Sequence, residues 1–136
     1  MFPSTNNLIF DFGTAITIDF INANNQYLGG NISPGLNTRF KALHHYTGKL
    51  PLIEKNEHFE MTGKTTEEAI ISGVQKGIVY EIEGYIREMQ SSFANLNVIF
   101  TGGDAFFFEK KVKNSIFVEP MLVFFGLNRI LEYNAK

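Results

Sequence analysis

The sequence contains neither cysteine nor tryptophan among its 136 residues. Without cysteine, the chain has no disulfide framework and no zinc site built on thiolates. This absence fits a reducing compartment, and we expect a cytoplasmic protein. An excess of basic residues is also missing, because 12 Lys and Arg stand against 14 Asp and Glu, for a formal net charge of −2. Proteins that bind nucleic acid usually carry a basic patch that displaces counterions from phosphates, so nucleic acid is not an expected partner.

Long apolar runs are absent as well. No stretch approaches the roughly 18 apolar residues that a membrane-spanning helix requires, and the first residues, MFPSTNNLIF, show neither the basic region nor the apolar region of a secretory signal. We therefore expect no membrane association. Hydrophobic residues make up 44% and charged residues 19%, close to the averages of globular proteins. The length suits one domain, and we predict a single domain over residues 1–136.

The hydrophobic pattern predicts an α/β fold. Alternating or continuous apolar runs predict strands at residues 8–12, 15–21 and 26–32, then at 97–100 and within 115–120. Helical spacing predicts helices at about 36–46, 66–93 and 104–112, and a last helix with Pro120 in its first turn. Three antiparallel strands followed by helices that alternate with further strands match the ribonuclease-H-like half-domain. Duplication of that half-domain builds the actin, sugar-kinase and Hsp70 group.

The long helix has a clear start and an unusual glycine content. Thr65-x-x-Glu68 is a capping box, in which each side chain satisfies a backbone N–H at the helix start. An apolar stripe then runs from Ile70 to Phe93 at three- and four-residue spacing. Glycines at positions 73, 77 and 84 lie beside it, although a helical glycine costs about 1 kcal/mol relative to alanine. We predict that this side of the helix packs closely on another element and forms much of a dimer interface.

The segment LIFDFGTAITIDF, residues 8–20, interrupts an apolar run with polar residues and glycine. Gly13 and Thr14 form a short turn between two strands, where exposed amides and a hydroxyl can donate to phosphate oxygens. Asp11 would repel phosphate but can hold a cation beside it. The alternative is a β-turn in which Asp11 only accepts backbone hydrogen bonds. Asp19 alternates with buried positions, and we interpret it as structural.

Several short motifs occur in a fixed order along the chain. They are DFGTAIT, GGNISPG, the TGKLP block, TTEEAIISG and TGG, beginning respectively at residues 11, 29, 47, 65 and 101. In this order the sequence resembles the type III pantothenate kinases over nearly its whole length. The resemblance implies transfer of the γ-phosphoryl group of ATP, with Mg²⁺, to pantothenate, giving 4'-phosphopantothenate in the first step of coenzyme A biosynthesis. It also implies a homodimer that uses K⁺ or NH₄⁺.

The resemblance assigns roles position by position. Asp11 resembles the ligand of the monovalent cation, and Gly13 and Thr14 resemble the ATP-phosphate loop. Thr66 resembles the threonine that binds pantothenate. Gly102 and Gly103 resemble the loop on the nucleoside side of the ATP site.

The sequence also departs from that family. Its members carry an upstream half with a second phosphate loop, D-x-G-N-T, and a G-x-D-R segment whose Asp is the catalytic base. Neither motif is present here, and no Asp-Arg pair occurs in the chain. We therefore expect this chain to correspond to the C-terminal lobe of a two-lobe enzyme, with no catalytic residue of its own and little activity alone.

Two other functions are compatible with the same fold. One is a non-catalytic module for dimerisation or regulation, as proposed for relatives described as transcriptional accessory factors. The other is a nuclease, which would need several carboxylates around a divalent metal. His44 and His45 are adjacent on a predicted helix, so their side chains diverge by about 100° and cannot share one metal.

Overall fold

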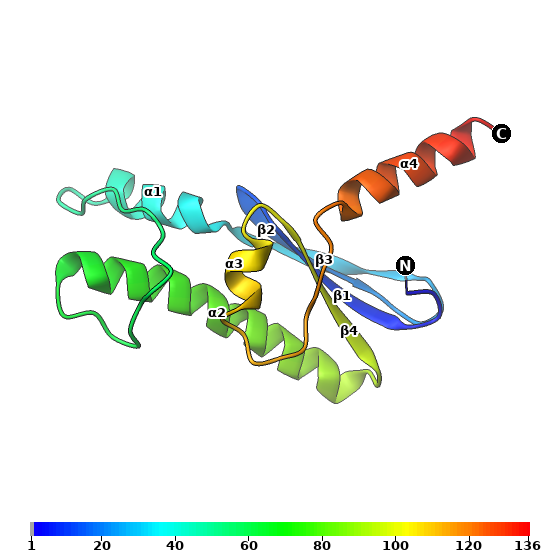
Figure 1. Ribbon diagram of the computed structural model, residues 1–136, viewed down its shortest axis with the longest axis horizontal. Helices are drawn as coiled ribbons and strands as arrows, with labels where there is room; N and C mark the ends of the chain where they lie inside the picture. Colours follow the sequence, from blue (N-terminus) through cyan, green and yellow to red (C-terminus); the bar gives the residue numbers. More distant parts are fainter. Residues whose placement is uncertain (1) are drawn as a thin grey trace.

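The computed structural model describes residues 2–136 as one mixed sheet with flanking helices (Figure 1). The strands are β1 (Asn6–Phe12), β2 (Ala15–Ile21), β3 (Tyr27–Pro34), β4 (Leu96–Gly102) and β5 (Phe117–Val118). The helices are α1 (Leu36–Tyr46), α2 (Thr66–Ser92), α3 (Ala105–Glu109) and α4 (Leu122–Asn134). The predicted order of strands and helices is confirmed.

The strands lie in the order β3-β2-β1-β4-β5. The first three are antiparallel neighbours, whereas β4 is parallel to β1 and β5 is parallel to β4. This is the arrangement expected for the ribonuclease-H-like half-domain, and it confirms the predicted α/β class. Because β1 and β4 are parallel, their carboxyl ends meet at the same edge of the sheet.

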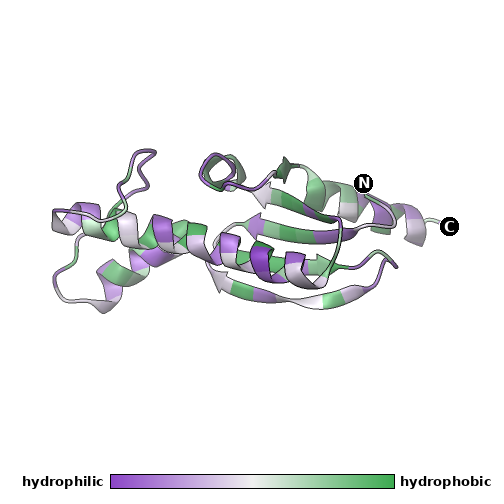
Figure 2. Cartoon of the chain, turned by 90° about the horizontal axis from the view of Figure 1, so that it is seen from below, coloured by the Kyte–Doolittle hydropathy of each residue, from purple (hydrophilic) through white to green (hydrophobic). Residues whose placement is uncertain are grey.

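One face of the sheet carries the hydrophobic core. Leu8, Phe10 and Phe12 of β1 are at most 1% exposed and pack against α2, which runs along the sheet (Figure 1). The predicted apolar stripe of α2 is confirmed, since Ile78 and Ile86 are fully buried. Hydrophilic and hydrophobic residues alternate along this helix in Figure 2, as expected for an amphipathic helix that covers one layer.

The start of α2 follows the predicted capping box with one difference. The hydroxyl of Thr65 accepts a hydrogen bond from the Glu68 N–H at 3.2 Å, as predicted. The Glu68 carboxylate accepts instead from the N–H of Lys64 at 2.8 Å, one residue before the cap. Both bonds satisfy backbone donors that a helix start leaves without partners.

Two expectations about helix bounds are wrong, and close packing on the glycine side of α2 is not found within the chain. The helix predicted over 104–112 is shorter, and Pro120 precedes the last helix, which begins at Leu122. The Gly73 and Gly77 side of α2 does not pack closely within the chain, since a Cβ built at either glycine would meet no atom within 4 Å.

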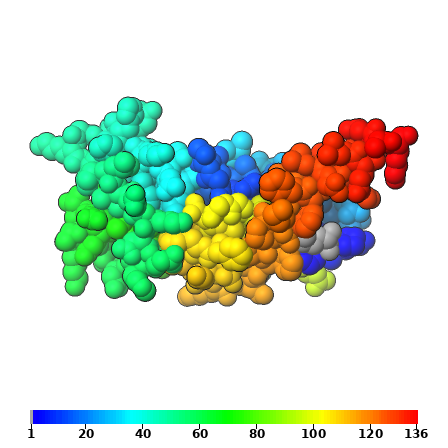
Figure 3. Space-filling view, turned by 45° about the horizontal axis from the view of Figure 1, so that its top comes forward, coloured from blue at the N-terminus to red at the C-terminus, as the bar shows by residue number. Residues whose placement is uncertain are grey.

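Helix α4 stands away from the body of the molecule (Figures 1 and 3). None of its residues is buried, and apart from the half-buried Leu122 its large apolar side chains are exposed, from 51% at Val123 to 81% at Tyr133. Across residues 2–136, no helix combines the length and the hydropathy that crossing a membrane would require.

Candidate functional site

The structure brings most of the predicted site residues to one edge of the sheet. The Gly13-Thr14 turn joins β1 to β2 there, and β4 ends beside it, with Phe12 and Gly102 as register partners. Gly103 continues the chain from the same point. In α/β sheets the carboxyl ends of strands are where ligands usually bind.

Asp11 lies on the sheet face opposite the core. Its cross-strand partner in β2 is Thr17 and its partner in β4 is Thr101, so three oxygen-bearing side chains form one row across this face. Burial raises the pKa of the Asp11 carboxyl, and the negative charge of Asp19 raises it further. Asp19 itself accepts a hydrogen bond from the hydroxyl of Tyr27 at 2.8 Å. Asp11 is thus a half-buried carboxylate whose charged form a bound cation would stabilise.

Gly102 fits against Asp11 as only a glycine can. Its φ is +91°, and a Cβ built there would lie 2.5 Å from Asp11 Oδ1 and 2.6 Å from both the N and O atoms of Phe12. Gly103 differs, because its Cβ would meet no atom within 4 Å. The glycine pair therefore has a close-packed member beside the carboxylate and an open member at the surface.

The Gly13-Thr14 turn is held by backbone contacts. The Gly13 N–H donates to the Ala15 carbonyl at 3.1 Å, and the Gly35 N–H donates to the Thr14 carbonyl at 2.9 Å. A Cβ at Gly35 would lie 2.1 Å from the Gly13 oxygen, so α1 begins directly against the turn. Thr14 itself is exposed, leaving its hydroxyl open to a ligand.

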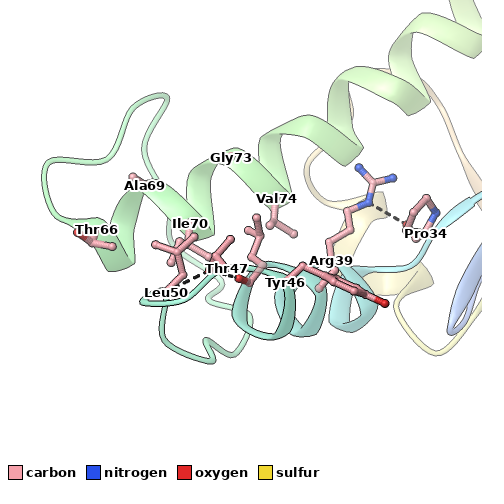
Figure 4. Close-up of a pocket in the computed structure, with 12 residues that line it drawn as sticks. Pro34, Arg39, Tyr46, Thr47, Leu50, Thr66, Ala69, Ile70, Gly73 and Val74 are labelled. Carbon is pink, nitrogen blue, oxygen red and sulfur yellow. Dashed lines mark hydrogen bonds between the residues drawn. The ribbon is translucent and has the colours of Figure 1, made fainter.

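Thr66 is not brought to this edge. It lines a groove of about 880 Å³ between α1 and α2, at the end where Leu50 and Thr47 lie (Figure 4). Pro34, at the other end of the groove, is next to the turn. The 11-residue helix α1 separates the two ends, which is a length of roughly 16 Å at 1.5 Å per residue. Thr66 and Thr14 of one chain therefore cannot contact the same small substrate atom.

An ion pair closes the near end of this groove. Arg39 of α1 pairs with Glu81 of α2, and its Nε donates to the Pro34 carbonyl at 2.8 Å. The hydroxyl of Ser33 donates to Glu81 at 2.7 Å. Burial would raise the pKa of Glu81, but the hydrogen bonds from Arg39 and Ser33 outweigh it and lower that pKa. The network ties β3, α1 and α2 together beside the turn.

The long connection from α1 to α2 is held by a buried amide. Gln75 is fully buried, its Oε1 accepts from the Asn56 N–H at 2.9 Å, and its Nε2 donates to the Asn56 carbonyl at 2.8 Å. Lys55, the residue before Asn56, forms an ion pair with Asp104 at 2.8 Å. Asp104 directly follows Gly103 in the chain. The exposed His44 forms a hydrogen bond between its Nδ1 and the Leu50 carbonyl at 2.8 Å, which is a structural role.

Sequence reasoning did not identify Thr17 and Gly35 as site residues, and it placed Thr101 only in the loop with Gly102 and Gly103, not beside Asp11. Two signals were present, since Thr101 begins the TGG motif and Gly35 follows a proline before a helix. The pairing of β4 with β1 could not be read locally, because it joins residues about 90 positions apart. Within residues 2–136 no group of three or more His, Cys, Asp or Glu residues could hold a metal, so the nuclease hypothesis gains no support there.

Comparison with known proteins gives a consistent family. The family model described as type III pantothenate kinase matches residues 1–88. A type III pantothenate kinase of Cytophaga hutchinsonii is 51% identical over 135 residues, covering 99% of this chain and 57% of the relative. One from Bacteroides fragilis (strain YCH46) is 52% identical over 133 residues, covering 98% of this chain and 55% of the relative.

A crystal structure agrees at the level of the fold. It is that of a conserved putative Baf family transcriptional activator from Campylobacter jejuni, with a TM-score of 0.71 and 30% identity, covering 96% of this chain and 59% of that one. This chain thus spans little more than half the length of the curated relatives it matches. Because the family model covers more than half of the chain, this protein belongs to the type III pantothenate kinase family.

Proposed function

We propose that this chain is the ATP-binding and pantothenate-binding lobe of a type III pantothenate kinase. The observation that supports this most directly is the meeting of Asp11, the Gly13-Thr14 turn and Gly102 at one sheet edge in a chain of this family. The reaction is ATP-dependent phosphorylation of pantothenate to 4'-phosphopantothenate, the first step of coenzyme A biosynthesis. A cytoplasmic location, where ATP is available, is part of the same proposal.

The residues present fit the ligands that this activity needs. The turn offers the N–H and the hydroxyl of the exposed Thr14 to phosphate oxygens, whereas the Gly13 N–H already donates to the Ala15 carbonyl. Helix α1, whose amino end carries partial positive charge, begins against the turn. The open Gly103 leaves room for the nucleoside. Mg²⁺ would enter with the nucleotide.

The surroundings of Asp11 suit a ligand of a monovalent cation better than a residue that only accepts backbone hydrogen bonds in the turn. Its carboxylate shares a face and a register row with the hydroxyls of Thr17 and Thr101, and oxygen donors suit hard cations. K⁺ or NH₄⁺ bound there would offset the negative charge of phosphate at the neighbouring turn.

Catalysis requires a second lobe. Phosphoryl transfer depends on positioning, charge stabilisation and a group that orients the attacking hydroxyl, and the G-x-D-R segment that carries the family's base does not occur in this sequence. Helix α4 also exposes an apolar stripe, including Phe124 at 61% and Leu127 at 51%, which another lobe would cover. We infer that the chain alone is inactive.

A homodimer completes this proposal. Gly73, Gly77 and Gly84 leave a smooth strip along α2 with no atom of the chain within 4 Å of their Cβ positions, and such a strip lets a second helix approach closely. Thr66, remote from the turn of its own chain, would then face the second copy. A strict monomer in light scattering at high protein concentration would contradict this part of the proposal.

The decisive experiment joins this chain to the part of the Cytophaga hutchinsonii relative that it does not span. We expect ATP-dependent phosphorylation of pantothenate that requires K⁺ or NH₄⁺. Thr14→Val should raise the KM for ATP roughly 5- to 150-fold, because Val keeps the shape and loses a hydrogen bond to a charged acceptor worth about 1 to 3 kcal/mol. Unchanged ATP kinetics in that variant would refute the phosphate role.

A second candidate function is a regulatory module without catalysis. The description of the Campylobacter jejuni protein as a putative Baf family transcriptional activator favours it. A hybrid that folds and dimerises but binds neither ATP nor pantothenate in calorimetry would support the module and exclude the kinase.

A further inference from the structure

Thr38 makes a contact that its position in a helix does not require. It is the third residue of α1, and its Oγ1 donates to the carbonyl of Thr14 at 2.7 Å, across 24 residues. Threonine in a helix commonly returns its hydroxyl to a carbonyl of its own helix. Here the hydroxyl leaves the helix and reaches the turn between β1 and β2.

The structure assigns Thr38 as a positioning residue for the Gly13-Thr14 turn: by holding the Thr14 carbonyl, it sets the direction in which the turn presents its donors to phosphate. This assignment rests on the proposed function for its consequence in ATP binding. Its consequence for the order of the turn is independent of that function.

The carbonyl of Thr14 is the point at which the turn is held. It accepts from the Gly35 N–H at 2.9 Å and from Thr38 at 2.7 Å. In a planar trans peptide the carbonyl of Thr14 and the N–H of Ala15 point in opposite directions, so the two donors fix that amide as well. Burial cannot do this, because Gly13, Thr14 and Ala15 are all exposed.

Of the two donors to the Thr14 carbonyl, the Thr38 hydroxyl is the one that a substitution can remove. Gly35 contributes a backbone N–H, which no substitution removes except proline, and the N-cap of α1 has no side-chain hydrogen bond. Thr38→Val keeps the β-branched shape and deletes only the hydroxyl. Thr38→Ser keeps the hydroxyl and deletes a methyl group. The pair therefore separates the hydrogen bond from packing.

Thr5→Val is a matched control. The Thr5 hydroxyl donates to the Phe2 carbonyl at 2.8 Å and accepts from Asn97 Nδ2 at 2.9 Å. It lies just before β1, at the opposite end of that strand from the turn. Its loss should reduce stability at least as much as Thr38→Val and leave the turn unaffected.

The test has two measurements. The first is amide hydrogen exchange by NMR in the 136-residue chain. Thr38→Val should accelerate exchange about five- to tenfold at Gly13 and Gly35, whose N–H groups are hydrogen-bonded at the turn, with Ser close to the parent and Thr5→Val unchanged. The second is steady-state kinetics in the hybrid kinase, where Thr38→Val should raise the KM for ATP by the same factor and leave the KM for pantothenate unchanged.

Each result decides the assignment. Unchanged exchange at the turn in Thr38→Val overturns it, and so does faster exchange with unchanged ATP kinetics. Loss of ATP affinity in Thr5→Val as well would show a general stability effect and would also overturn it. If the parent hybrid binds no ATP, the proposed function fails, while the exchange measurement still decides whether Thr38 holds the turn.

Discussion

Replacing Gly102 with alanine should destabilise the chain far more than the same change at its neighbour Gly103. Gly102 has a φ of +91° and Gly103 does not share this conformation. The methyl group at position 102 would lie 2.6 Å from the backbone N and O of Phe12, which belongs to the central strand and cannot move aside cheaply.

The expected magnitude follows from these two features. A residue with a Cβ in this region of φ costs about 1 to 3 kcal/mol, and overpacking against backbone adds about 1 to 3 kcal/mol. Together these give a fall in the free energy of unfolding of about 2 to 6 kcal/mol in Gly102→Ala. For a chain of this size this corresponds to a fall in Tm of about 10 °C. At Gly103 the added methyl group meets no atom within 4 Å, so the change should be within about 1 kcal/mol of zero.

Urea and thermal unfolding followed by circular dichroism measure both variants under the same conditions. The slope of the unfolding free energy against urea concentration should be the same as in the parent, which shows that the native state alone is affected. Equal stability of the two variants, or a Gly102→Ala protein as stable as the parent, would refute the inference that β4 packs closely on Asp11 and Phe12 at Gly102.

Three further changes test the charges and the buried amide. Asp11→Asn should raise the free energy of unfolding at pH 7 but not at pH 3, because the raised pKa of Asp11 means that the folded state disfavours the charged carboxylate above the ordinary pKa of 3.8. Equal effects at both pH values in urea unfolding would contradict this. In the hybrid kinase the same variant should lose the response to K⁺ or NH₄⁺. Glu81→Gln should have the opposite pH dependence, reducing the free energy of unfolding at pH 7 and changing it little at pH 3. The lowered pKa of Glu81 means that its carboxylate stabilises the fold above about pH 4.5, and this contribution is lost as pH falls through the folded pKa. A pH-independent loss in the same assay would contradict the ion pair. Gln75→Leu should cost about 2 to 4 kcal/mol in urea unfolding, since it leaves two backbone groups of Asn56 without partners, and a neutral effect would show that water replaces the amide.

The sequence alone predicted the local elements well. Alternation in LIFDF and AITIDFI indicates two strands around a Gly-Thr turn, and the structure has them as β1 and β2 with the register that this turn imposes. The stripe from Ile70 and the capping box at Thr65 set the face and the start of α2. These features depend on neighbouring residues, so their physical causes are present in short segments.

The candidate site was only partly predictable. Asp11, Gly13, Thr14, Gly102 and Gly103 could be selected from short motifs, but their meeting at one edge depends on the parallel pairing of β1 with β4, which no local pattern specifies.

What the sequence by itself determined is the identity and the facing of the elements, through hydrophobic period, caps and turn residues. Only the tertiary structure decided how distant elements meet. It sets the hydrogen bond from Thr38 of α1 to the turn, the close approach of Gly102 to Asp11, and the distance of Thr66 from both. The fate of α4 shows the reason. Its apolar pattern predicts a buried face, yet within the chain that face stays exposed, because periodicity shows that a surface favours burial and does not show what it packs against.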